Sequence, residues 1–299
     1  MRPVFEWNLG TRVLTLGKRT LVMGIVNVTP DSFSDGGEFL DPEKAVAHAL
    51  ELLDQGADII DVGGESTRPG AKVAASGSAK KAEARPPVPE KQELERVIPV
   101  IQKLKEQHPK ALVSIDTYKA TVARAAIEAG AEIVNDVSAF RWDPTMGKTV
   151  AGLKCGAILM HMRGRPEEWR NLEPVSDIVV LVKRELRDWA DKATMAGVKR
   201  ERIVLDPGFG FGKNFEQNYP LLRRFDEFHQ LRHPLLAGVS RKSFIGRMLA
   251  RDGKDAPVDQ RLFGTVAAET AAILKGAHII RTHDVRATVE AARAADLVA

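Results

Sequence analysis

Two sets of polar side chains in this sequence are of types that bind small molecules. The first set combines two carboxylates with an amide: Asp116, Asn135 and Asp206. Such groups offer fixed acceptors and donors, which suit the ring N–H, amino and carbonyl groups of a flat, nitrogen-rich heterocycle. The second set is Arg68, Arg281 and His283, with the backbone amides of glycine-rich loops. These groups suit a phosphate-type anion, because arginine can give it two parallel hydrogen bonds.

Four further residues have side chains that can bind metals. Asn27 can hold Mg²⁺ by its amide oxygen, since that ion keeps most of its waters and takes few protein ligands. His161 lacks a second His or Cys at ligand spacing, so we interpret it as a core or loop histidine. The single Cys155 excludes an internal disulfide and starts an apolar run, which favours a buried structural thiol. Asp61 is interpreted as a cap for backbone amides and is left out of the site.

The stretch from Arg202 to Lys213 reads RIVLDPGFGFGK and predicts a ligand-binding loop. Its apolar run is long enough only for a buried strand, which must stop at Asp206 because Pro207 cannot continue a central strand. Glycine then occupies positions 208, 210 and 212, and glycine lets the backbone come close to a ligand. The spacing matches neither the dinucleotide fingerprint nor the phosphate-binding P-loop.

Apolar runs alternate with stretches of helical period from Leu21 onward. The predicted strand–helix units are 21–28 with 42–55, 58–62 with 90–107, 111–115 with 118–129, 132–137 with 144–153, 156–162 with 174–196, 202–206 with 215–230, 234–239 with 241–250 and 258–275, and 278–282 with 284–297. Eight such units indicate one α/β domain over residues 1–299, a (β/α)₈ TIM barrel, which typically takes ~250 residues. Residues 3–19 predict an N-terminal β-hairpin that caps it. Residues 71–89 lack an apolar period and predict a mobile loop insert.

Every predicted strand ends in polar residues, and in such a barrel the functional groups cluster at the carboxyl ends of the strands. Ser240, Arg241 and Lys242 leave one of these ends and precede a helix. One interpretation is a helix cap with first-turn charges. Basic residues at a helix N-terminus oppose the macrodipole, however, which favours a functional role.

The overall composition is that of an ordinary soluble globular protein, with 44% hydrophobic and 28% charged residues. The net charge of +4 is spread along the chain without a basic stripe of interleaved aromatics, so no nucleic-acid partner is expected. The N-terminus has no apolar signal region, and apolar residues never run together for the 18 positions that a membrane span needs. We therefore expect a cytoplasmic protein without a membrane partner.

Seven motifs at the predicted strand ends resemble those of the dihydropteroate synthases, the pterin-binding barrels of folate biosynthesis. They are 23–37 (MGIVNVTPDSFSDGG), 63–70 (GGESTRPG), 114–117 (SIDT), 135–136 (ND), 206–213 (DPGFGFGK), 240–243 (SRKS) and 281–285 (RTHDV). They occur in family order, and all seven together are highly specific. The resemblance implies condensation of 6-hydroxymethyl-7,8-dihydropterin pyrophosphate with p-aminobenzoate to give 7,8-dihydropteroate and pyrophosphate.

The resemblance also implies roles for the residues at matching positions. The pterin would be bound by Asp116, Asn135, Asp206 and Lys242, with Met160, Phe211 and Gly210 lining its slot. The p-aminobenzoate site would be bordered by Thr67, Arg68, Pro69, Ser240 and Lys242. Pyrophosphate would be held by Asn27, Arg68, Arg281 and His283, with Asn27 as the Mg²⁺ ligand. The catalytic residues would be Asp35, Asp116, Lys242, Arg281 and His283.

The mechanism implied for this family is SN1-like, because loss of pyrophosphate leaves a cationic methylene on the pterin. Arg281 and His283 with Mg²⁺ would stabilise the leaving group, and Asp116 the developing cation. Loops 29–37 and 63–70 would close and exclude water. The resemblance further implies a homodimer through the barrel's helices, with 265–277 as a contact surface, and a p-aminobenzoate site that sulfonamides mimic. The insert 71–89 departs from the family pattern, but the motif before it is intact, which favours a harmless surface extension.

Two other functions stay open. A methyltetrahydrofolate-using methyltransferase would share the pterin pocket, but it has no use for the anion set Arg68, Arg281 and His283. A non-catalytic paralogue that only binds pterin would be expected to lack loop residues such as Asp35 and Arg68, and both are present.

Overall fold

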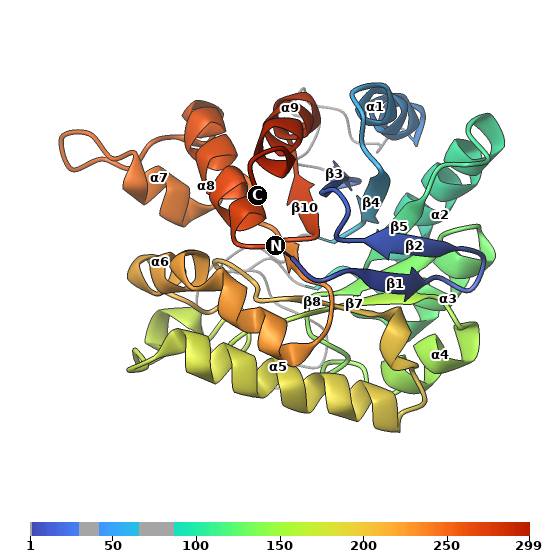
Figure 1. Cartoon of the computed structure of the whole chain (residues 1–299). Helices are drawn as coiled ribbons and strands as arrows, with labels where there is room; N and C mark the ends of the chain where they lie inside the picture. Colours follow the sequence, from blue (N-terminus) through green and yellow to red (C-terminus); the bar gives the residue numbers. More distant parts are fainter. Residues whose placement is uncertain (1, 30–41, 66–86) are drawn as a thin grey trace.

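Eight parallel strands form a barrel with helices around it, in a computed structural model that describes residues 2–29, 42–65 and 87–299 (Figure 1). The strands are β3 (Leu21–Asn27), β4 (Ile59–Gly63), β5 (Val113–Asp116), β6 (Ile133–Asp136), β7 (Gly156–Met160), β8 (Ile203–Asp206), β9 (Leu236–Ala237) and β10 (Ile279–Thr282). The helices are α1 (Pro42–Asp54), α2 (Glu90–Gln107), α3 (Ala120–Glu128), α4 (Met146–Leu153), α5 (Ile178–Met195), α6 (Phe215–Arg223), α7 (Ser243–Met248), α8 (Leu262–Leu274) and α9 (Val285–Asp296). The predicted (β/α)₈ barrel is confirmed.

Strand pairing follows the chain around the barrel. Strands β3 to β8 pair in sequence order, and β10 pairs with both β3 and β9. A parallel bridge between Leu205 and Leu235 joins β8 to the residue before β9. Because all these pairs are parallel, the carboxyl ends of the strands lie at one end of the barrel.

The helices cover the barrel because each has an apolar stripe. On α2 the buried positions Val97, Val100, Ile101 and Leu104 recur at three- and four-residue spacing, which places them on one face. Helix α5 is capped by Asp177, whose carboxylate accepts from the backbone N–H groups of Val179 and Val180 and satisfies two otherwise unpaired donors. Among the described residues, no helix is both long and apolar enough to cross a membrane.

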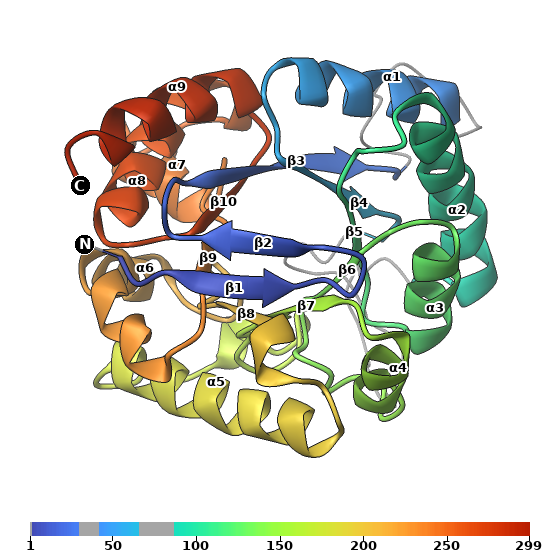
Figure 2. The same ribbon diagram turned by 45° about the vertical axis from the view of Figure 1, so that its right-hand side comes forward.

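The N-terminal hairpin of β1 (Phe5–Asn8) and β2 (Val13–Leu16) lies across one end of the barrel (Figure 2). Trp7 and Leu16 are fully buried there, and the Trp7 indole donates to the carbonyl of Arg202 at 2.8 Å. At the first position of β7, a Cβ added to Gly156 would lie 2.4 Å from Leu9, so glycine permits this close contact. The prediction of a capping hairpin is confirmed.

The chain before the hairpin is fastened to the last strand and last helix. Arg2 pairs with Asp296 at 2.8 Å and donates to the carbonyl of Ala277 at 2.8 Å. His278 Nε2 lies 2.9 Å from the carbonyl oxygen of Pro3. Both ends of the described chain therefore lie on the same side of the barrel, as their labels in Figure 2 show.

The apolar interior at the hairpin end takes a residue from every barrel strand or, for β5, from the position just before the strand. Its members are Trp7, Leu9, Leu16, Leu21, Met23, Ile59, Leu112, Ile133, Ile158, Val204, Leu236 and Ile279. A second, larger cluster fills the layer between the strands and the helices. The barrel is therefore a packed core at this end.

The single helix predicted over 215–230 is wrong in its second half. Helix α6 ends at Arg223, and a 3₁₀ helix spans Phe225–Leu231. The buried positions of this segment, Phe225, Phe228 and Leu231, are spaced by three residues, which is the period of a 3₁₀ helix. Of the insert expected over 71–89, residues 71–86 lie outside the described structure, and Pro87–Pro89 lead into α2.

Candidate active site

Polar side chains from distant parts of the sequence meet inside the carboxyl end of the barrel. Side chains alternate between the two faces of a strand, so residues two positions after an interior residue also point inward. The pairs that follow this rule are Ile59 and Asp61, Ile133 and Asn135, Val204 and Asp206, and Ile279 and Arg281. The register thus places two carboxylates, one amide and one guanidinium in the same interior layer.

Arg281 connects this layer through two ion pairs. Its Nε donates to Asp61 Oδ2 at 2.6 Å, and its Nη2 donates to Asp116 Oδ2 at 2.8 Å. The Asn135 amide donates to the same Asp61 oxygen at 3.1 Å. Asp61 is fully buried, while 17% of the Asp116 side chain is exposed. The network therefore holds the ends of four strands together, β4, β5, β6 and β10, and leaves Asp116 as its accessible carboxylate.

The environment of the carboxylates shifts their pKa values toward neutrality. Burial raises the pKa of Asp116 to about 7, with Arg281 lowering it and Asp61 raising it. Burial also raises the pKa of Asp206 to about 6, against the hydrogen bond from the Gly208 amide at 2.7 Å. Carboxyl groups that titrate in this range are typical of functional sites, because a small change in their surroundings alters their charge.

The loop after Asp206 is shaped by its glycines, but they approach the protein's own backbone. Gly208 and Gly212 have φ values of 68° and 65°, and an added Cβ would lie 1.9 Å from the His161 carbonyl and 2.1 Å from that of Arg163. The buried Lys213 donates to the carbonyls of His161, Gly208 and Phe211, at 3.2, 2.7 and 3.1 Å. Glycine is needed here to seat the loop on the end of β7.

An apolar wall lies beside the carboxylates. Met160, Met162 and Val137 form a buried cluster, and Phe211 packs against it. The Nζ atom of Lys242 lies 3.9 Å from the centre of the Phe211 ring, in a cation–π contact. The structure thus brings together three residues predicted to contact one ligand, Met160, Phe211 and Lys242. A Cβ added to Gly210 would lie 3.5 Å from the Lys242 side chain, so Gly210 belongs to the same group.

Ser240 and His283 form a second polar group at the ends of β9 and β10. Ser240 Oγ accepts from the His283 backbone N–H at 3.1 Å and lies 3.0 Å from His283 Nδ1. Because Thr282 also donates to this oxygen at 3.4 Å, the hydroxyl proton is directed at Nδ1, and the ring proton is assigned to Nε2. Burial lowers the pKa of His283 to about 3, so the ring is a neutral donor at pH 7.

The capping interpretation of Ser240, Arg241 and Lys242 is not supported. Lys242 occupies the position before α7, and no side-chain hydrogen bond caps that helix. Ser240 bonds to His283, and Arg241 Nε pairs with Asp284 at 2.9 Å. All three side chains therefore contact other strand ends or the loop after β8.

Asn27 is the last residue of β3 and is half-buried beside Gly63 of β4. Its side chain makes no hydrogen bond to another residue that the structure describes. Within the described ranges, three or more His, Cys, Asp or Glu side chains nowhere come together as a metal site. A single ligand such as Asn27 is compatible with Mg²⁺, because this ion takes one or two protein ligands and completes its shell with water and phosphate oxygens.

Four predicted site residues, Asp35, Thr67, Arg68 and Pro69, lie outside the described residues. The interpretation of Asp61 as a backbone cap was wrong, since its partners are the side chains of Arg281 and Asn135. Its signal was available in the sequence, because Asp61 shares the strand phase of Ile59. The buried Lys213 was also missed, since a lysine after a glycine loop gives no sign that it folds back on backbone carbonyls.

His161 and Cys155 are core residues, as expected. His161 is fully buried, stacks on Trp189 at 4.9 Å between ring centres, and bonds to Glu185 at 2.9 Å. Cys155 is 2% exposed, and burial raises the pKa of its thiol to about 11, which makes it a poor nucleophile at pH 7.

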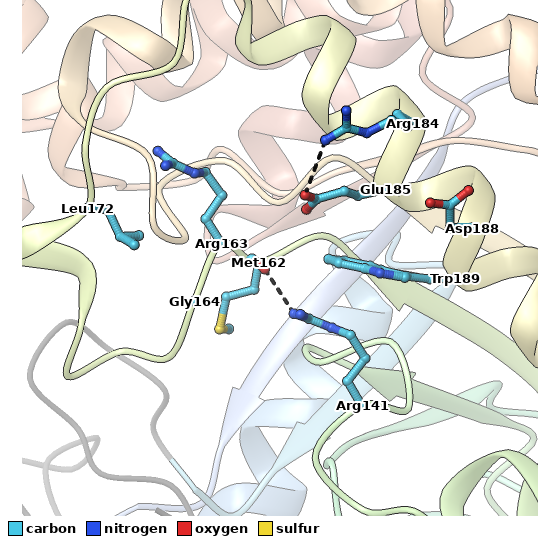
Figure 3. Close-up of a pocket in the computed structure, with 9 residues that line it drawn as sticks. All are labelled: Arg141, Met162, Arg163, Gly164, Leu172, Arg184, Glu185, Asp188 and Trp189. Carbon is cyan, nitrogen blue, oxygen red and sulfur yellow. Dashed lines mark hydrogen bonds and ion pairs between the residues drawn. The ribbon is translucent and has the colours of Figure 1, made fainter.

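A separate cavity of about 420 Å³ is lined by Met162, Arg163 and Gly164 of the segment that follows β7, together with residues of α5 (Figure 3). Arg141 stacks on Trp189 at 3.8 Å and donates to the carbonyl of Met162 at 2.8 Å, while Arg184 reaches Glu185 at 4.0 Å. Arg184 and Glu185 thus form an ion pair at the cavity wall, and none of the predicted site residues lines it.

Comparison with known proteins agrees with this geometry. The sequence profile of the pterin binding enzyme family matches residues 23–283. A dihydropteroate synthase from Clostridium beijerinckii is 44% identical over 291 residues, which are 97% of this chain and 98% of that protein. The dihydropteroate synthase of Xanthomonas albilineans, solved with 4-aminobenzoic acid, superposes with a TM-score of 0.86 at 43% identity, covering 99% and 98% of the two chains. A structure of the same enzyme with 7,8-dihydropteroate gives 0.82 at 41% identity and 98% coverage of each chain.

These similarities span nearly the whole length of both partners. The chain therefore belongs to the pterin-binding enzyme family and, within it, to the dihydropteroate synthases, which are transferases of folate biosynthesis.

Proposed function

We propose that this chain condenses 6-hydroxymethyl-7,8-dihydropterin pyrophosphate with p-aminobenzoate by an SN1-like path. One observation carries the proposal: Asp116, Asn135 and Asp206 converge inside the barrel, next to the apolar wall that contains Met160 and Phe211. Acceptors and donors beside an apolar wall suit a flat heterocycle whose edge is polar and whose faces are not.

The proposed mechanism separates charge between two groups of residues. The ionised Asp116 would face the pterin and stabilise positive charge as it develops on the ring and its methylene carbon. Arg281 and His283 would take up the charge of the departing pyrophosphate, His283 through its neutral Nε2–H. Lys242, which lies on the Phe211 ring, would bridge the pterin and p-aminobenzoate parts of the site.

Mg²⁺ is proposed as the cofactor, with Asn27 as its protein ligand. It would supply positive charge to pyrophosphate oxygens when bound. Asp35 and Arg68, assigned to the two loops by resemblance, would complete the anion site. Ser240 would border p-aminobenzoate with Thr67 and Pro69, the subsite that sulfonamides occupy in this family. In support, a structure of the Yersinia pestis dihydropteroate synthase holds a sulfonamide drug.

A cytoplasmic homodimer is proposed as the working form. Exposed apolar side chains lie between the end of α7 and the start of α8, where Met248, Val258 and Phe263 are 51%, 53% and 85% exposed. If these side chains form one patch, it would be more typical of a protein interface than of a free surface. They lie N-terminal to the surface 265–277 expected from the sequence, and a second copy of the chain is the proposed occupant.

The decisive measurement is pyrophosphate release by the purified protein from dihydropterin pyrophosphate and Mg²⁺, with and without p-aminobenzoate. Release that depends on p-aminobenzoate and matches the dihydropteroate formed is expected, as is competition by a sulfonamide. Tight pterin binding without release would instead identify a binding paralogue. Methyl transfer from methyltetrahydrofolate would identify the second alternative.

A further inference from the structure

A cluster of four buried charges lies behind the ends of β4 and β5, outside the proposed substrate site. Its members are Glu65, Glu93, Arg96 and Lys119, which we call the Lys119 cluster. Lys119 pairs with Glu65 at 2.5 Å and also with Glu93, and the three side chains are 5%, 7% and 1% exposed. Burial raises the pKa of Glu93, and the nearby Lys119 partly offsets this rise. The two cations and two carboxylates balance.

The cluster joins three elements that are separate in sequence. Arg96 of α2 donates to the carbonyl of Gly64 at 2.7 Å. Glu65 accepts from the Val88 backbone N–H at 3.1 Å, so its carboxylate lies between the start and the end of the second strand–helix connection. After the end of β5, the Lys119 backbone N–H donates to the hydroxyl of Thr117 at 3.2 Å, and Thr117 directly follows Asp116. The turn Gly63–Glu65 is thereby fixed from behind by side chains of α2 and of the segment after β5.

This turn lies against the substrate site. Gly63 pairs in register with both Asn27 and Asp116, and its carbonyl accepts from the Val28 N–H at 2.7 Å. A Cβ added to Gly63 would lie 3.5 Å from the Asp116 Cβ, which shows how closely the turn packs on that residue. Displacement of Glu65 therefore changes where the chain leaves β4, directly before positions 67–69.

A buried ion cluster is a poor way to stabilise a fold. The cost of removing several charges from water commonly cancels their attraction, and apolar replacements of similar size are often equally stable. Paired charges can instead fix the relative positions of the segments that carry them, because each pair has one favourable arrangement. The cluster's four members contact backbone or side chains at the exits of two site-forming strands, which is where such geometry has a use.

We propose that Lys119 is a positioning residue for the p-aminobenzoate half of the reaction. Through Glu65 and Glu93 it fixes the turn Gly63–Glu65, from which the residues assigned to p-aminobenzoate continue. The pterin residues Asp116, Asn135 and Asp206 are held by strand pairing and by Arg281, so their positions are set mainly by contacts other than those of Lys119. This inference rests on the proposed function.

The test separates position from stability with three variants. Lys119→Met leaves two buried carboxylates without their cation, so we expect a lower Tm and a KM for p-aminobenzoate raised by about tenfold to a hundredfold. Adding Glu93→Gln removes one of those charges, and the Tm should recover while the KM stays raised, because Glu65 still lacks its partner. Lys119→Arg should restore the KM. Affinity for the pterin substrate, measured by calorimetry, should change less than about twofold in all three.

Lys105→Met is the matched control. Lys105 lies on α2, as Glu93 and Arg96 do, and pairs with a buried carboxylate, Glu132 at 3.9 Å, but at the hairpin end of the barrel. It should lower the Tm and leave the KM unchanged. A KM that returns to the wild-type value together with the Tm in the double variant would overturn the inference, because it would show a purely structural role.

A second readout does not depend on turnover. Amide hydrogen exchange at residues 63–65 should be faster in the double variant than in the wild type, and exchange at 113–116 should not change. Equal exchange at 63–65 in the two proteins would refute positioning by Lys119, whether or not the wild type is active. A wild-type protein that releases no pyrophosphate would instead count against the proposed function alone.

Discussion

The two ends of the barrel are built from the same strands and serve opposite purposes. At the hairpin end the inward residues are Ile59, Ile133, Val204 and Ile279, and two positions later they are Asp61, Asn135, Asp206 and Arg281. The first layer is closed by Trp7 and Leu16 and needs only apolar contact. The second layer buries charge and holds it with ion pairs. Along each of these strands, the apolar packing residue and the polar site residue are therefore one period of the pleat apart.

The difference teaches how a folded chain tolerates carboxylates inside it. Burying a carboxyl group that titrates near neutrality lowers the stability of the native state, because the group would be ionised in the unfolded chain. Burial of apolar side chains at the hairpin end offsets this loss of stability, and these contacts do not depend on charge. Substitutions at the two ends should therefore affect activity and stability separately.

The largest expected effect is on turnover at the charged end. We expect Asp116→Asn and Lys242→Ala to reduce dihydropteroate formation by roughly a thousandfold, because each removes a charge aimed at the reacting pterin. The fold should survive, since Asp61 still pairs with Arg281 in the first variant and Lys242 is only half-buried.

Turnover of both variants is measured by pyrophosphate release, and circular dichroism checks the fold. Near-wild-type rates in either variant would contradict the assignment of that residue. Loss of the folded signal would mean that the charged end also carries the stability of the barrel, and the comparison between the ends would fail.

The next effect is on stability at the hairpin end. Trp7→Ala removes a fully buried indole and its hydrogen bond to the Arg202 carbonyl, so the free energy of unfolding should fall by about 3–5 kcal/mol. Denaturant titration measures this change. The kcat of the folded fraction at low temperature should equal that of the wild type, and Val13→Thr, at an exposed position of the same hairpin, is the control. A kcat lowered in proportion to stability would show that the two ends are coupled.

The smallest effect is a pH response of opposite sign at the two ends. Burial raises the pKa of Asp206 to about 6 and lowers that of His278 to about 4. Asp206 therefore contributes stability at low pH that is lost as the pH rises from about 4 to 6. His278 is neutral when folded, so stability is lost as the pH falls from about 6.5 to 4. Each change amounts to at most about 3 kcal/mol.

Thermal unfolding of two variants between pH 4 and 7 measures these slopes. Relative to the wild type, Asp206→Asn should gain Tm as the pH rises, and His278→Asn should gain Tm as the pH falls. Parallel slopes in both variants would mean that the two ends do not differ in their titrating groups.

The barrel could be predicted from the sequence because its signals are local. Short apolar runs such as Ile203–Leu205 and amphipathic stretches such as 90–107 carry their structure in their own periodicity. Boundaries were harder where tertiary packing decides them, as at Phe225, where a 3₁₀ helix replaces the expected α-helix.

The partners of charged groups could not be predicted in the same way. The sequence indicates that Arg281 and Asp116 belong to one site, but their ion pair depends on the register of strands 165 positions apart. Asp61 shares the strand phase of Ile59, but its partners Arg281 and Asn135 lie on other strands, so the ion pair itself could not be predicted. The Lys119 cluster was invisible for the same reason, since its members come from two connections and a helix.

The fastening of the first residues to the last strand and helix has a consequence for synthesis. Arg2 and Ala277, whose bond closes the hairpin end, are 275 positions apart, so a ribosome needs roughly tens of seconds to make the second after the first. Throughout that interval the barrel strands that bury Trp7 and Leu9 are not all synthesised. The hydrophobic residues of this hairpin thus leave the exit tunnel long before the strands that bury them have been made.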